Sequence, residues 1–187
     1  MRALRGTLLV AALAASTALQ AQTQAARTLE LEGGERIAYT LRLHPLDAHL
    51  VRPAAVLAPT SALDTARLLN LHLSTGDIEE AALLSNAPRR RFEVLQDYRR
   101  SVGDDEFKRI FAQYLVPENR LVAEIAIDRH RLLIWELKQA AAEPAGHLAG
   151  QYFVEVDGRY LVDDVPGATR TSLRRVLEAY RAGKIPR

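Results

Sequence analysis

The sequence predicts an α+β fold: an antiparallel, curved sheet of hairpins packed against a block of short helices, with a further helix at the C-terminus. Apolar and polar residues alternate near the start of the chain and again from Leu121 to Val165, as in half-buried strands. Between these regions, from Ser61 to Pro117, apolar residues recur at helical spacing, and a last helical pattern follows Thr169. Strands, then helices, then strands and one helix is the order of an α+β protein.

The first strand pair is predicted around Gly33-Gly34, because two glycines supply the positive φ that a tight hairpin turn needs. Leu29 and Leu31 share one face of the first strand. The second strand has an alternating apolar row, which is Ile37, Tyr39, Leu41 and Leu43.

Four short helices are predicted next. Ser61 and Asp64 form a capping box at the start of the first helix, and Gly76 ends it. Asp77 caps the second helix, and the third and fourth helices follow on either side of Gly103. The fourth helix has the clearest apolar face, which is Phe107, Ile110, Phe111, Tyr114 and Leu115.

Four strands are predicted after the helices. Residues 121–127 and 132–138 are expected to pair across a turn at 128–131, and Asp157-Gly158 has the sequence of a type I′ hairpin turn. The final helix ends at Gly183 and has an apolar face, which is Leu173, Val176, Leu177 and Tyr180.

The stretch LNLHLSTGDIEEAALLS resembles the opening helices of nuclear transport factor 2-like domains, in which Gly-Asp separates a helix from a second short helix. Long strands and a Gly-turn hairpin follow, as in that family, and the resemblance spans roughly Leu63 to Val165. It implies a cone-shaped domain with a pocket between sheet and helices, a fold that hosts isomerases, dehydratases and non-catalytic binding modules. The extra N-terminal hairpin, the four helices and the C-terminal helix depart from the family pattern.

The first 21 residues have the layout of a secretory signal peptide. Arg2 and Arg5 precede an apolar run from Leu8 to Ala15, which is shorter than the roughly 20 residues of a membrane-spanning helix. We expect residues 1–21 to be removed and residues 22–187 to form a single α+β domain without stable membrane insertion. The expected location is the periplasm of a Gram-negative bacterium, with the extracellular medium as the alternative.

The composition limits the chemistry. The chain has no cysteine, so it has no disulfide and no thiolate metal ligand. It has 25 Lys+Arg and 23 Asp+Glu, and removal of Arg2 and Arg5 leaves 23 residues of each sign. A mature chain without net charge gives no general reason to bind nucleic acid or an anionic membrane. No phosphate-binding loop, dinucleotide fingerprint or His-Glu-x-x-His pattern occurs, and no cofactor is expected.

The triplet Asp128-Arg129-His130 has two interpretations. An Asp–His pair can perform acid–base catalysis where the two side chains meet and the imidazole is oriented. Charged residues at a strand junction more commonly form a solvated turn, and the sequence favours the turn.

Glu124 interrupts an otherwise apolar strand and either faces solvent or lines a cavity as a catalytic acid. Trp135, the only tryptophan, is expected in the core; partial exposure on the sheet would instead mark a ligand or partner surface, with Tyr152 as a further wall residue. By alternation Glu124 points away from an apolar row, which is Leu121, Ala123, Ile125 and Ile127.

His44, Asp47 and His49 lie in a proline-rich loop. Imidazole and carboxylate groups are ordinary zinc ligands, but this spacing matches no helical ligand motif. A solvated loop is the simpler interpretation, and no metal is expected.

Nine arginines form a basic cluster that could bind an anionic partner. The alternative is that they lie on solvated helix faces and pair with neighbouring acids. The nine are Arg89, Arg90, Arg91, Arg99, Arg100, Arg170, Arg174, Arg175 and Arg181.

Two hypotheses for function follow. The first is an exported periplasmic, non-catalytic binding or interaction protein, with an immunity or inhibitor protein as one form of it, whose partner is a protein or a small molecule. The alternative is a small isomerase- or dehydratase-like enzyme with an acid in a sheet–helix pocket, for which the candidates are Glu124, Asp128 and His130.

Overall fold

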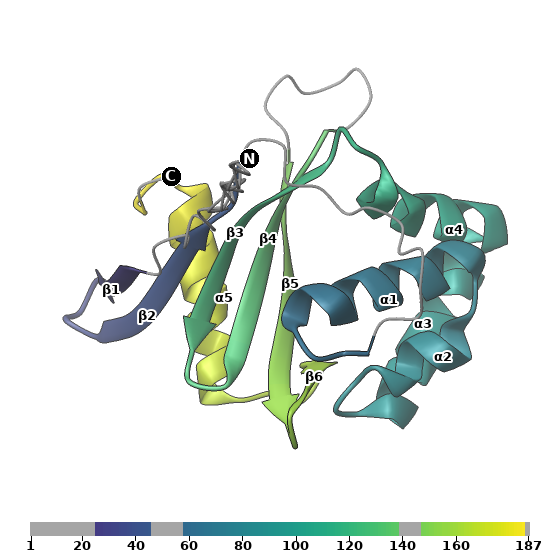
Figure 1. Ribbon diagram of the computed structural model, residues 1–187, viewed down its shortest axis with the longest axis horizontal. Helices are drawn as coiled ribbons and strands as arrows, with labels where there is room; N and C mark the ends of the chain where they lie inside the picture. The colour runs from purple at the N-terminus through teal and green to yellow at the C-terminus, as the bar shows by residue number, and fades with distance from the viewer. Residues whose placement is uncertain (1–24, 46–57, 139–146, 186–187) are drawn as a thin grey trace, which may run out of the picture.

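Six antiparallel strands form one open sheet in the computed structural model, which describes residues 25–45, 58–138 and 147–185. The α+β prediction is confirmed (Figure 1). The strands follow the chain order across the sheet: β1 (Ala25–Glu30), β2 (Arg36–Leu43), β3 (Arg120–Ile127), β4 (His130–Leu137), β5 (His147–Val156) and β6 (Arg159–Val162).

The helical block is inserted between two neighbouring strands, because β2 pairs directly with β3. The first hairpin and the later four strands are therefore one continuous meander. The helices are α1 (Ala62–Thr75), α2 (Ile78–Leu83), α3 (Pro88–Val102), α4 (Asp104–Ala112), the short 3-10 helix η1 (Gln113–Leu115) and the C-terminal α5 (Ala168–Arg181). None of the described helices is long and apolar enough to cross a membrane.

Local signals place the helix ends and the last hairpin. The Ser61 hydroxyl accepts a hydrogen bond from the Asp64 N–H at 3.1 Å and donates one to the Asp64 carboxylate at 2.7 Å, which confirms the predicted cap. Gly76, with φ of 82°, ends α1. Asp157 and Gly158 both have positive φ, at 51° and 77°, as the predicted type I′ turn requires.

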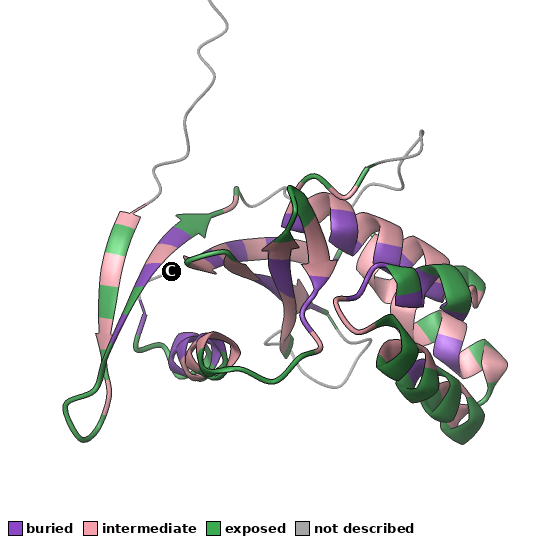
Figure 2. Cartoon of the chain, turned by 90° about the horizontal axis from the view of Figure 1, so that it is seen from below, coloured by how far each residue is buried: buried purple, intermediate pink, exposed green. Residues whose placement is uncertain are grey.

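Two hydrophobic cores lie on opposite faces of the sheet. Leu133 and Trp135 of β4 pack in the core formed with α1 to α4, whereas Leu132 and Ile134 pack in the core formed with α5. All four residues are 0% exposed, because alternate side chains of the strand enter different cores. Figure 2 shows α5 end-on beneath the sheet and the helical block beside it.

A register shift in β3 places Leu121 on the opposite face of the sheet from the rest of its apolar row. The shift falls between Leu121 and Ala123. Leu121 packs in the core of the helical block, whereas Ala123 and Ile125 pack in the core of α5. The prediction that these three residues share a face is wrong for Leu121, because the bulge adds one residue to the alternation.

The sheet leaves part of β5 without a further strand. β6 pairs only with residues 153–156 of β5, so Gly150, Gln151 and Tyr152 lie beyond its end. On the α5 side, a Cβ added to Gly150 would lie 2.6 Å from Leu177 Cδ2 and 3.0 Å from Leu132 Cδ1. Glycine at this position lets α5 approach the strand closely.

We predict that Gly150→Ala lowers the free energy of unfolding by about 1–3 kcal/mol, because the new methyl group overpacks a filled core. Denaturant unfolding of the variant and the wild type measures this difference. Leu177→Val removes the contacting methyl groups. In that background Gly150→Ala should lower the free energy of unfolding by clearly less. An unchanged penalty in that background would contradict the packing explanation.

Candidate functional site

The Asp128-Arg129 pair forms the turn between β3 and β4, where Ile127 pairs with His130. Asp128 adopts a positive φ of 50°. His130 makes its ion-pair contact elsewhere: its Nδ1 lies 3.0 Å from Oδ2 of Asp163, a residue only 2% exposed. The structure thus joins His130 to an aspartate 33 residues away in sequence.

Asp163 belongs to a polar network that ties the helical block to the sheet. The Asn86 amide donates to Asp163 Oδ1 at 3.0 Å and accepts from the Asp164 N–H at 2.8 Å. The Asp164 carboxylate accepts from the Ser85 hydroxyl at 2.7 Å and from the Arg91 guanidinium at 3.2 Å. Both aspartates are thus held by fixed donors. Sequence reasoning missed them, because their partners are His130, 33 residues from Asp163, and residues of the helical block more than 70 residues away.

Glu124 is partly buried and lies between two arginines. Its side chain is 18% exposed and contacts two guanidinium groups, Arg131 at 3.6 Å and Arg42 at 4.0 Å. Arg131 also lies over the Tyr160 ring at 5.6 Å from the centroid. The arginines come from the strands on either side, so Glu124 serves as a cross-strand ion pair.

Trp135 is a core residue with one polar contact. Its Nε1 donates to Gln151 Oε1 at 2.9 Å, and the Gln151 amide donates to Asn70 at 3.2 Å. The Tyr114 ring packs edge-on against Trp135 with centroids 5.9 Å apart. Full burial excludes Trp135 from the protein surface, so it is a core residue rather than part of a ligand or partner surface.

A cleft runs along the uncovered part of β5. Its inner part, which we call the inner pocket, has a volume of about 310 Å³ and lies between the helical block and β5. Its apolar and aromatic lining is Leu69 from α1, Phe111 from α4, Tyr114 from η1, and Phe153 and Val162 from the sheet.

The outer part of the cleft, which we call the outer groove, lies between α3 and the start of α5 and measures about 320 Å³. Arg90 and Arg174 line it. Tyr152, Asp164 and Arg170 line both parts, so the two parts adjoin at the edge of β5. Each part lies at the lower end of the roughly 300–1,000 Å³ typical of small-molecule sites.

Tyr152, a candidate wall residue from the sequence, lines both parts of the cleft. The Arg170 guanidinium lies over its ring, 5.5 Å from the centroid. Burial raises the pKa of the Tyr152 hydroxyl, against the smaller opposing effect of nearby arginines, of which Arg181 is the largest. The hydroxyl therefore stays protonated at neutral pH and can donate a hydrogen bond.

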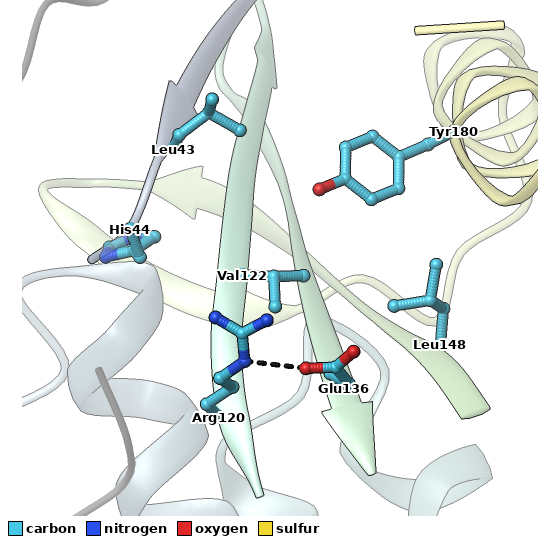
Figure 3. Close-up of a pocket in the computed structure, with 7 residues that line it drawn as sticks. All are labelled: Leu43, His44, Arg120, Val122, Glu136, Leu148 and Tyr180. Carbon is cyan, nitrogen blue, oxygen red and sulfur yellow. Dashed lines mark hydrogen bonds and ion pairs between the residues drawn. The ribbon is translucent and has the colours of Figure 1, made fainter. Parts of the chain in front are cut away.

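A smaller pocket of about 150 Å³ lies on the other face, between the strands and α5 (Figure 3). Tyr180 extends from α5 toward the strands, and Arg120 and Glu136 form an ion pair of 2.6 Å at one end. The lining also includes His44, whose Nε2 is buried without a hydrogen-bond partner among the described residues. This volume is about half the lower limit of a typical small-molecule site.

Asp47 and His49 lie outside the described residues, so the predicted loop cluster is represented only by His44. Over residues 25–45, 58–138 and 147–185, no group of three His, Asp or Glu side chains is arranged to hold a metal ion. Burial, followed by the charge of Arg42, lowers the pKa of His44 to about 4, which keeps its imidazole neutral at physiological pH.

A third hollow, of about 500 Å³, lies between the first hairpin and α5. Its charged lining is mainly acidic, with Glu30, Glu32, Glu35 and Glu178 against Arg175 and Lys184. Arg175 is already paired with Glu35 at 2.7 Å. We take the cleft as the candidate site, because it combines aromatic walls with cationic groups at its mouth.

Comparison with known proteins identifies no relative: no family model, no curated protein and no solved structure matches this chain. The resemblance to nuclear transport factor 2-like domains therefore stays a prediction.

We predict that Asp163→Ala lowers the free energy of unfolding by about 1–3 kcal/mol, because it leaves the partly buried Asn86 amide and His130 without their acceptor. Asp128→Asn is the control, since asparagine tolerates positive φ, and should change stability by less than about 0.5 kcal/mol. Thermal or denaturant unfolding measures both. An equal loss in the control would contradict the specific role of Asp163.

We predict a pH effect from His44. Its pKa is about 4 in the folded protein and 6.5 for an unperturbed histidine, so the unfolded chain binds the proton more readily. The free energy of unfolding should therefore fall as the pH is lowered from about 6.5 to about 4, by about 1–2 kcal/mol for this half-buried side chain. In His44→Gln this component should be absent. If the free energy of unfolding depended on pH in the same way in both proteins, the assignment of this effect to His44 would be wrong.

Proposed function

We propose that this chain is an exported, non-catalytic binding protein of the periplasm that takes a small ligand in the cleft along β5. One observation carries the proposal. The cleft joins an aromatic inner pocket to a groove with guanidinium groups at its rim, while the carboxylates beside it are held in fixed contacts. Such an arrangement suits recognition by shape and charge.

The catalytic alternative requires an acid in the sheet–helix pocket. Glu124 does not line the cleft and is paired with Arg42 and Arg131. Asp163 does line it, but its two oxygens are engaged by His130 and Asn86. A carboxylate held in this way orients its neighbours rather than accepting a substrate proton, which favours binding over catalysis.

Export is part of the proposal and rests on the signal-peptide pattern of residues 1–21. No feature of the described residues selects an immunity or inhibitor role, which stays a prediction from the sequence.

We predict that the processed protein binds members of a small-molecule library in the cleft. The full chain would be expressed in a Gram-negative host and purified from the periplasmic fraction, where loss of residues 1–21 tests export. Two-dimensional NMR with a mixed set of anionic, neutral and cationic aromatic compounds should show shifts concentrated at Gln151, Tyr152 and Arg170. Tyr152→Ala should weaken binding about tenfold through loss of its aromatic contact.

Val156→Ala is the matched control, because it shortens an exposed side chain of the same strand outside the cleft. It should leave affinity unchanged. Shifts concentrated at the smaller pocket beside Tyr180 or at the hollow beside the first hairpin would contradict the proposed function, as would chemical conversion of a bound compound.

A further inference from the structure

We propose that the cleft selects small organic anions, with an oxyanion group held by Arg90, Arg170 and Arg174 and an attached aromatic or apolar group in the inner pocket. This inference rests on the proposed function and adds the chemical class of the ligand. A carboxylate, sulfonate or phosphate meets the same requirement, because each presents oxygens that a guanidinium group binds in pairs.

The structure separates these three arginines from the other six of the predicted basic cluster. The six are engaged: Arg89 with Glu93, Arg91 with Asp164, Arg99 with Asp104, Arg100 with Asp97, Arg175 with Glu35, and Arg181 with the Leu148 carbonyl. Arg90, Arg170 and Arg174 have no carboxylate within hydrogen-bond or ion-pair distance among the described residues. All three line the outer groove.

The groove therefore carries an unmatched positive charge. The one carboxylate among its lining residues, Asp164, is already neutralised by Arg91 and accepts a further hydrogen bond from Ser85. Three guanidinium groups confined to one small concavity repel one another, and an anion relieves that repulsion. The groove is thus complementary to negative charge and unfavourable for cations.

Two features hold the cationic groups in place. Tyr152 packs under the Arg170 guanidinium and restricts its orientation, which lowers the entropy lost on binding. The start of α5, at Gly167, has no side-chain cap and no acidic residue in its first turn, so its dipole adds to the same positive potential.

The inner pocket defines the rest of the ligand. Its apolar walls include Leu69, Phe111 and Tyr114. Asp163 also lines it, and both oxygens of that carboxylate are held by His130 and Asn86. An aromatic group attached to the oxyanion would bury apolar surface there while the charge stays at the arginine-lined mouth. A free inorganic anion lacks this second contact and should bind more weakly.

The test compares two probes that differ by one charged group. 8-Anilinonaphthalene-1-sulfonate has an aromatic body with a sulfonate, and N-phenyl-1-naphthylamine has the same body without it. Fluorescence titration of the mature protein should show tighter binding of the sulfonate by about tenfold or more, as expected for charge-assisted hydrogen bonds. Added salt should weaken binding of the sulfonate and leave the affinity of the neutral probe nearly unchanged.

The double variant Arg170→Gln/Arg174→Gln should bind the sulfonate about tenfold to a hundredfold more weakly than the wild type does. Its affinity for the neutral probe should not fall. Arg89→Gln/Arg100→Gln removes the same charge from exposed positions outside the cleft and should change sulfonate affinity less than about twofold. Circular dichroism verifies that both variants stay folded.

An equal loss of sulfonate affinity in the two double variants would overturn the inference, because the loss would then follow from the change in overall charge rather than from the groove. Equal binding of both probes in the cleft would also overturn it, yet leave the proposed binding function standing. Absence of sulfonate binding overturns it as well, and the library experiment then decides the proposed function by itself.

Discussion

The burial of β4 on both faces is the constraint on which the rest of the structure depends. Leu132 to Trp135 alternate between two cores, and neither core forms unless helices cover both sides of the sheet. The helical block inserted between β2 and β3 supplies one cover, and α5 returns across the other. Gly150 permits the close approach of α5. The short β6 leaves the adjacent edge of β5 between these two layers.

The cleft is a product of that layered arrangement. Helices α1 and α4 with η1 supply its aromatic wall, α3 and α5 supply its cationic rim, and β5 supplies its floor. A network of hydrogen bonds joins the helical block to the end of β6, through Asn86, Asp163 and Asp164. It fixes the position of one side of the cleft relative to the other. Binding residues placed on rigid elements in this way lose little conformational entropy when a ligand enters.

Signals that act within a few residues were readable from the sequence. The Ser61–Asp64 cap and the Asp157-Gly158 turn depend only on local backbone preferences, and both are present. The half-buried alternation expected from Leu121 to Val165 is wrong for β4, because Leu132 to Trp135 are buried on both faces of the sheet. The β3 bulge, the Asp163 partner of His130 and the absence of carboxylate partners for Arg170 and Arg174 among the described residues could not be read, because each depends on segments brought together by folding. Tyr152 was a candidate from the sequence, but its cationic neighbours come from tertiary packing.

The central claim is that the edge of β5 between the two layers is the ligand site and that its arginines bind the charged group. A crystal structure of the mature protein with 8-anilinonaphthalene-1-sulfonate tests it most directly. We expect the sulfonate oxygens within hydrogen-bond distance, about 3 Å, of the Arg170 or Arg174 guanidinium, and the aromatic body against Tyr152 and Phe111. Density for the probe in the pocket beside Tyr180, or in the hollow beside the first hairpin, with the cleft empty, would contradict the account.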